Sequence, residues 1–108
     1  MAQEKNPMTV FAEECPQIAA ALNDLIDTIR AMPALDGKTR QLVNIGIQTA
    51  TRNPRGVYFH AMMARNEGAA REEVLGAVVM NLHLAGLAAV LDCLSPAIEG
   101  YAAAEIQS

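Results

Sequence analysis

Residues 53–74 read NPRGVYFHAMMARNEGAAREEV and contain the start of one helix, its end and the start of the next. Asn53 is a good helix N-cap, and Pro54 fits the first helical turn because that turn does not use its N–H group. Gly68 suits the C-terminal cap of the same helix. The two acids after Arg71 suit a first turn, where the helix dipole favours negative charge. The stretch therefore predicts two consecutive helices.

The sequence before this stretch predicts two more helices. Pro16 is tolerated in a first turn, and apolar residues follow it in steps of three and four until Pro33 ends the pattern. These apolar residues are Ile18, Leu22, Leu25, Ile26 and Ile29. Asp36 is a good N-cap for the next helix, which we expect to run to about Thr51.

The two ends of the chain complete the predicted organisation. Residues 1–8 form a polar arm, and Ser95-Pro96 predicts that the last helix covers about 96–105. No internal repeat and no linker interrupts the chain. We therefore expect a single all-α domain over residues 1–108.

The composition agrees with helices and excludes several classes of protein. The chain has 108 residues, of which 52% are hydrophobic and 4% aromatic, and 20 are alanine, which favours helix over sheet. A disordered chain has lower hydrophobicity. Cys15 and Cys93 are too far apart in sequence to form a disulfide scaffold. A formal net charge of −4 argues against non-specific binding of nucleic acid.

The apolar content also predicts self-association. A monomer of this length buries about two-thirds of its unfolded surface, so part of the apolar surface stays exposed unless other subunits cover it. We therefore expect a homo-oligomer. The longest apolar run, Val74–Leu91, contains the polar residues Asn81 and His83, which are costly in lipid. It predicts a helix buried on most sides, in a core and a subunit interface, and no membrane span. The absence of an export signal and of paired cysteines predicts a cytoplasmic location.

Positive charge gathers in the middle of the chain. Residues 37–66 contain five basic residues and no acid, and Arg52 and Arg55 flank the predicted helix start at Asn53. A helix N-terminus with two arginines suits a small anion. The alternative is that the arginines pair with acidic residues of the same or a neighbouring subunit.

His60 is the candidate for proton transfer. Gly56 precedes it by one turn, Ala64 follows it by one turn, and both leave room beside the imidazole. A histidine in an apolar cleft near arginines suits a general base or acceptor. The alternative is a hydrogen-bonded structural histidine. His83 fits a buried hydrogen bond between helices better than a metal site, because the sequence has no pattern of further ligands. Cys15 and Cys93 fit small buried hydrophobes. We predict no metal and no cofactor.

The chain resembles the carboxymuconolactone decarboxylase family. The resemblance rests on Leu35-Asp36-Gly37-Lys38-Thr39-Arg40-Gln41-Leu42 and on His60 followed by Ala61, Ala64, Asn66, Gly68 and Arg71-Glu72-Glu73-Val74. It implies an all-α subunit of the alkyl hydroperoxidase D type that forms homo-oligomers, commonly trimers or hexamers. Its members include lactone decarboxylases and thiol-dependent hydroperoxide reductases.

The redox branch of this family carries Cys-x-x-Cys-x-x-x-His and an upstream Glu. Alignment on His60 places Asn53 and Gly56 at the two cysteine positions, Gln41 at the Glu position, and Arg55 where one group carries a second His. The resemblance therefore implies that the dithiol route is absent. The decarboxylase branch also lacks the cysteines and acts on an anionic lactone.

Three hypotheses follow for function. In the first, the protein is a decarboxylase-like lyase on a small carboxylate or lactone, with His60 moving the proton, Arg52, Arg55 and the helix start at Gly56 holding an oxygen, and Gln41 and Asn53 orienting it. In the second, it is a hydroperoxide reductase of peroxiredoxin type that uses Cys93. In the third, it is a non-catalytic oligomeric binder of small ligands.

Overall fold

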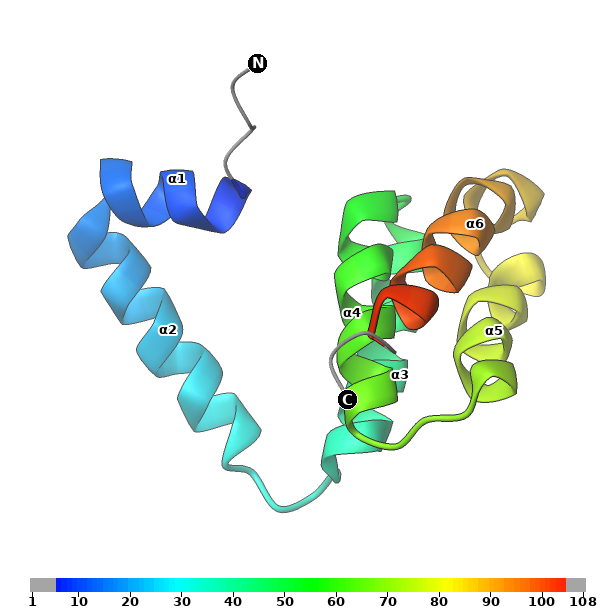
Figure 1. Ribbon diagram of the computed structural model, residues 1–108, viewed down its shortest axis with the longest axis horizontal. Coiled ribbons are helices and arrows are strands. Elements are labelled where there is room, and N and C mark those ends of the chain that lie inside the picture. The colour runs from blue at the N-terminus through cyan, green and yellow to red at the C-terminus, as the bar shows by residue number, and fades with distance from the viewer. Residues whose placement is uncertain (1–5, 105–108) are drawn as a thin grey trace. The chain divides into compact units, whose positions relative to one another are not determined.

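The computed structural model describes residues 6–104, so residues 1–5 of the predicted polar arm and residues 105–108 lie outside the described residues. The described part contains six α-helices, one short 3₁₀ helix and no strand (Figure 1), which confirms the all-α class. Packing divides the chain into two compact units, 1–34 and 35–108. That the whole chain acts as one domain stays a prediction.

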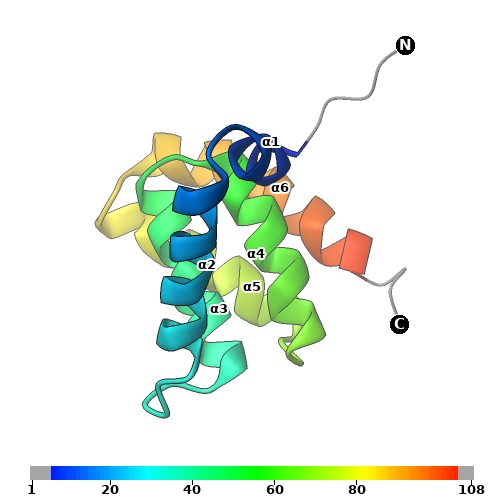
Figure 2. The same cartoon turned by 90° about the vertical axis from the view of Figure 1, so that its left-hand side faces the viewer.

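The first unit consists of α1 (Pro7–Glu14) and α2 (Pro16–Arg30). Asn6 caps α1, because its Oδ1 accepts a hydrogen bond from the backbone N–H of Met8 at 2.8 Å. Figures 1 and 2 show α1 set across the N-terminal end of α2. The predicted start of α2 at Pro16 is confirmed.

The second unit begins with a helical hairpin of α3 (Gly37–Ala50) and α4 (Pro54–Asn66). Both predicted N-caps are confirmed: Asp36 Oδ1 accepts from Thr39 N at 2.8 Å, and Asn53 Oδ1 accepts from Gly56 N at 3.1 Å. The short turn between the helices makes them run antiparallel and side by side. Residues near the start of α3 therefore lie opposite residues in the later part of α4.

The hairpin is followed by α5 (Arg71–Val79), the 3₁₀ helix η1 (Met80–His83) and α6 (Leu87–Ala104). Ala70 has no side chain that can cap α5, and Glu73 compensates because its Oε1 accepts from the Ala70 N–H at 2.8 Å. Glu73 also pairs with Lys38 of α3 at 3.1 Å. The Lys38–Glu73 ion pair thus connects the first turn of α5 to the first turn of α3.

The prediction that the last helix begins at Pro96 was wrong, because α6 begins at Leu87 and Pro96 lies inside it. Gly86 has φ +98°, a conformation that ends η1 before α6 begins. Pro96 costs α6 one backbone hydrogen bond. Packing stabilises the helix on both sides of Pro96, because buried residues recur along one face of it. These residues are Ala89, Val90, Cys93, Ala97, Gly100 and Ala104.

We expected the apolar run Val74–Leu91 to form one helix, buried in a core and a subunit interface. The single helix was wrong, and the burial in a subunit interface stays a prediction. The run spans α5, η1 and the start of α6 and breaks at Gly86. The backbone carbonyl of Asn81 accepts from the N–H groups of the three residues that follow η1, Leu84, Ala85 and Gly86. The side-chain nitrogen of Asn81 donates to Ala77 O at 3.1 Å. Six large apolar side chains of the run Val74–Leu91 are 40–68% exposed: Val79, Met80, Leu82, Leu84, Leu87 and Leu91.

The core of the second unit lies where α4 packs against α3 and α6, and where α5 packs against α3 and α6. Small residues let the helices approach closely. The buried cluster consists of Ile45, Val57, Ala61, Ala64, Ala69, Val74, Val78, Val90, Cys93 and Ala97. At Gly100, α6 approaches α4 so closely that an added Cβ would clash with the backbone carbonyl of Tyr58. The hairpin therefore packs against a buried apolar cluster.

Among residues 6–104, one helix, α6, is long and apolar enough to cross a membrane by length and composition alone. One third of its residues are buried inside the protein. A core helix of a soluble protein meets the same criteria, so this observation is weak evidence for a membrane span.

Candidate functional site

The centre of the candidate site is the contact between His60 of α4 and Gln41 of α3. His60 Nδ1 lies 2.8 Å from Gln41 Oε1, although the residues are 19 positions apart in sequence. Gln41 is 8% exposed and His60 is half-buried. The antiparallel hairpin creates the contact, because it places the second turn of α3 beside the middle of α4. The two residues that the sequence predicted to act together are thus neighbours.

This contact assigns the protons of the imidazole. An amide oxygen only accepts hydrogen bonds, so His60 Nδ1 donates to it. Asn44 Nδ2 lies 3.5 Å from the same oxygen, which agrees with this orientation of the Gln41 amide. In the neutral ring the lone pair then lies on Nε2. The arrangement presents Nε2 of His60 as a proton acceptor and its conjugate acid as a proton donor.

The start of α4 carries a second polar cluster on the same hairpin. Asn53 Nδ2 donates to Gln48 Oε1 at 2.8 Å, while Asn53 Oδ1 caps the helix at Gly56. A Cβ built on Gly56 would lie 2.6 Å from Gln48 Oε1. The amide of Gln48 therefore occupies the space that a side chain at residue 56 would need.

The two arginines that the sequence placed in the site differ in their surroundings. Arg52 pairs with Asp92 of α6, with Nε 2.8 Å and Nη2 2.6 Å from the same Oδ2. Its alternative role, pairing with an acid of the same subunit, thus holds in the structure. Arg55 is exposed and forms no ion pair within the described residues. Of the two, Arg55 has the charge that a ligand anion can use.

The sequence and the fold are similar to those of known proteins. The sequence model of the carboxymuconolactone decarboxylase family matches residues 16–99, which is most of the chain. The protein belongs to the carboxymuconolactone decarboxylase family. The structure is similar to that of an apo carboxymuconolactone decarboxylase family protein from Legionella pneumophila, with a TM-score of 0.76 and 25% identity over 90% of this chain and 86% of that chain. No curated protein matches the sequence.

This family member lacks a thiol at the two positions where the redox branch carries cysteines. Asn53 caps α4 and Gly56 is packed against Gln48, so neither position supplies a nucleophile. Cys93 is fully buried on α6, and burial, followed by the charge of Asp92, raises the pKa of its thiol. A neutral buried thiol is a poor nucleophile. The surroundings of Cys93 do not suit hydroperoxide reduction.

The remaining predicted polar residues lie outside the site. Cys15 is half-exposed between α1 and α2. His83 ends η1 and is exposed, so the prediction of a buried hydrogen bond between helices was wrong. The physical reason is that Asn81 and Gly86 break the apolar run, and His83 then lies on the exposed part of η1.

Sequence reasoning missed Asn44 and Gln48. They follow Gln41 at steps of three and four on α3, and this polar row borders the buried face formed by Gln41, Ile45 and Thr49. The spacing alone could have indicated the row, because residues three and four apart share a helix face. The contacts with α4 could not be foreseen without the pairing of the two helices.

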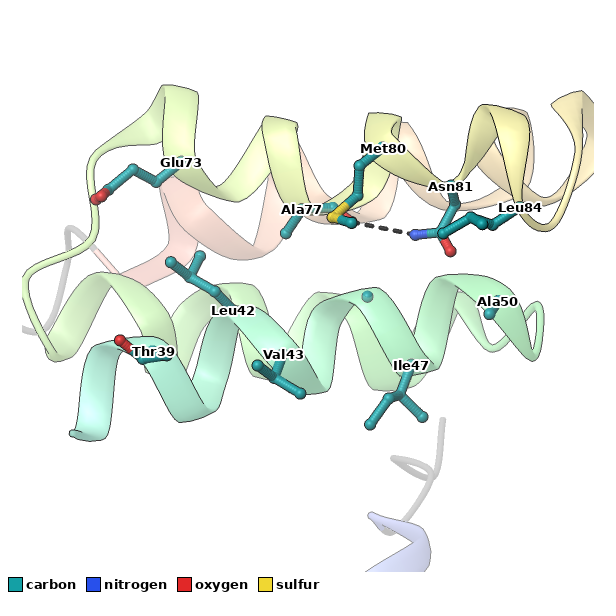
Figure 3. Close-up of a pocket in the computed structure, with 11 residues that line it drawn as sticks. Thr39, Leu42, Val43, Ile47, Ala50, Glu73, Ala77, Met80, Asn81 and Leu84 are labelled. Atoms are coloured by element: carbon teal, nitrogen blue, oxygen red, sulfur yellow. Dashed lines mark hydrogen bonds between the residues drawn. The ribbon is translucent and has the colours of Figure 1, made fainter. Parts of the chain in front are cut away.

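A separate groove of about 570 Å³ lies on the other side of α3 (Figure 3). Its lining is mainly apolar and comes from α3, α5, η1 and the residue that follows η1. The apolar members are Leu42, Val43, Gly46, Ile47, Ala50, Ala77, Met80 and Leu84, and the polar members are Thr39, Glu73 and Asn81. Neither Gln41 nor His60 lines it. The groove offers apolar contact, and the candidate residues for proton transfer lie elsewhere on the hairpin.

Proposed function

We propose that the protein is a decarboxylase-like lyase that moves a proton on a small anionic substrate, a carboxylate or a lactone. The observation that carries this proposal is the 2.8 Å hydrogen bond between His60 Nδ1 and Gln41 Oε1. It fixes the ring orientation and assigns to Nε2 the transfer of the proton to and from the substrate. Membership of the carboxymuconolactone decarboxylase family supports the substrate class.

The chemistry assigns a role to each part of the site. When a carboxylate leaves as CO₂, the electron pair of the broken C–C bond stays on the substrate as an enolate. His60 in its protonated form then donates a proton to carbon and regains one from water. Arg55 and the N-terminus of α4 favour the negative charge that the substrate carries. Gln41 keeps the proton on Nδ1 throughout.

Carboxymuconolactone, the compound in the family name, is the first substrate to test. The release of CO₂ is followed for the wild type and for His60→Ala. A proton-transfer role predicts that the substitution costs about 10²–10⁴-fold in rate. An equal rate for the two proteins, with both folded, would exclude His60 from the chemistry.

A second candidate function is the binding of a small apolar ligand without catalysis. The groove supports it, because about 570 Å³ falls within the usual range for ligand pockets. Native mass spectrometry of the freshly purified protein separates the two functions. A bound mass that is lost in His60→Ala supports the lyase, and a bound mass that is lost in Ile47→Arg but kept in His60→Ala supports the binder.

We also propose that the protein is a cytoplasmic homo-oligomer, a trimer or a hexamer. The exposed apolar side chains of η1 and of the start of α6 support self-association, because surface of this kind is costly in water. The same native mass spectra report the number of subunits. A monomer at micromolar concentration would contradict this part of the proposal.

A further inference from the structure

We infer that Gln48 is a substrate-contacting residue of this site, whose side-chain N–H donates to the oxygen on which the substrate develops negative charge. The inference rests on the proposed function and names a residue that neither the family motif nor the sequence pattern assigns.

The position of Gln48 follows from the pairing of α3 and α4. Gln48 lies seven residues after Gln41 on α3, and Gly56 lies four residues before His60 on α4. The Gln48 amide packs against Gly56, with Oε1 2.6 Å and Cδ 2.7 Å from a Cβ built there. At a rise of about 1.5 Å per residue, this point is about 6 Å along α4 from His60. A small molecule can span that separation.

The hydrogen bonding of Gln48 leaves its donor group available. Oε1 accepts from Asn53 Nδ2 at 2.8 Å, which fixes which end of the amide is oxygen. The amide nitrogen forms no hydrogen bond within residues 6–104, and the side chain is half-buried. Asn53 is itself held as the cap of α4. The amide is therefore oriented before a ligand binds, as an effective oxyanion donor must be.

The surrounding charge favours an anionic ligand oxygen at this donor. Residues 37–66 contain no acid, and Arg52 is neutralised by Asp92. Gln48 supplies an uncharged donor beside Gly56, about one helical turn along α4 from His60, and Arg55 supplies charge at the helix start. Gln48 and Arg55 together suit a substrate that has a carbonyl or enolate oxygen at one end and a carboxylate at the other.

The test uses NMR with paraconate, a γ-lactone that bears one carboxylate. The side-chain NH₂ signals of Gln48 and the ring signals of His60 are followed as paraconate is added to the wild-type protein. Both sets are expected to shift with the same dissociation constant. The variants are Gln48→Leu, which removes the amide, and Gln48→Glu, which keeps an acceptor for Asn53 but loses the donor. Gln17→Leu, at an exposed glutamine of α2, is the matched control.

A donor role predicts that Gln48→Leu and Gln48→Glu each weaken paraconate binding about tenfold, and that Gln17→Leu leaves it unchanged. If Gln48→Glu binds as the wild type does, Gln48 only anchors Asn53 and the inference is wrong. If paraconate shifts His60 but not the Gln48 amide, the inference fails while the proposed function stands. If it shifts the Gln48 amide but not His60, the role of His60 fails and Gln48 remains an anion donor. If it shifts neither, both are overturned.

Discussion

Arg52 and Asp92, 40 positions apart, form the ion pair that joins the turn after α3 to α6. Two guanidinium nitrogens, Nε and Nη2, contact the same carboxylate oxygen at 2.8 and 2.6 Å. Arg52 also adopts φ +56°, which is uncommon for a residue with a side chain. The pair therefore has a structural role, and the positive charge of Arg52 is already compensated within the subunit.

The different surroundings of the two arginines predict different effects on anion binding. Arg55→Ala is expected to weaken paraconate binding roughly two- to fivefold, because an exposed charge contributes modestly. Arg52→Ala is expected to leave binding nearly unchanged and to lower the melting temperature slightly. Titration calorimetry and thermal unfolding of both variants measure this. A larger loss of binding in Arg52→Ala than in Arg55→Ala would show that the pair opens to accept the ligand.

The close approach of α4 and α6 predicts a large effect of one methyl group. Gly100→Ala would place a Cβ against the carbonyl of Tyr58, which is backbone and cannot turn aside. We expect a loss of about 1–3 kcal/mol in the free energy of unfolding. Gly76→Ala is the control, because nothing lies within 4 Å of its added Cβ, and inside α5 it should gain about 0.5–1 kcal/mol. Urea unfolding measures both, and equal effects would contradict the packing described.

The cap of α3 predicts part of the acid sensitivity. The N–H and hydroxyl of Thr39 hold the pKa of Asp36 below its ordinary value, with smaller contributions from Lys38 and Arg40. A lowered folded-state pKa means that the stabilisation is present above the unfolded-state value near 3.8 and is lost as pH falls through the folded-state value.

Asp36→Asn keeps a capping oxygen without a titrating group, so its unfolding free energy should fall less steeply with pH below about 4 than that of the wild type. Asp24→Asn, at an exposed position inside α2, serves as the control. Urea unfolding at several pH values compares the slopes. The same slope for Asp36→Asn and the wild type would rule out the capping contribution.

Local signals predicted the start of most helices because caps and prolines act within a few residues. Asp36, Asn53 and Pro16 begin helices as expected. The prediction of a helix start at Pro96 was wrong, because α6 begins at Leu87. The helix tolerates the one backbone hydrogen bond that Pro96 removes, since its buried face packs against the core. Tertiary packing, which a sequence does not display, decided that boundary.

The candidate site was predictable in part. Gln41 and His60 could be named from their alignment with the family motif, and the hairpin brings them together. The pairing of Arg52 with Asp92 and the contact of Gln48 with Gly56 depend on which helix faces which. These contacts join α3, α4 and α6 across many positions, and no local spacing encodes them.

The burial of Cys93 predicts that it takes no part in thiol chemistry. Because burial raises the pKa of its thiol, Cys93 should react with a thiol reagent only on unfolding, whereas the half-exposed Cys15 should react in the folded protein. Mass spectrometry of the labelled protein distinguishes the two sites. With a supplied dithiol reductant, Cys93→Ser should consume hydroperoxide no more slowly than the wild type. A loss of consumption in this variant would revive the reductase hypothesis.

The tautomer of His60 tests the central claim most directly, because it requires no substrate. Long-range ¹H–¹⁵N NMR of the ring, recorded at a pH where the imidazole is neutral, shows which nitrogen carries the proton. The hydrogen bond to Gln41 predicts Nδ1–H with a lone pair on Nε2, and a shift towards the other tautomer in Gln41→Leu. A wild-type ring protonated on Nε2, unchanged in Gln41→Leu, would contradict the account.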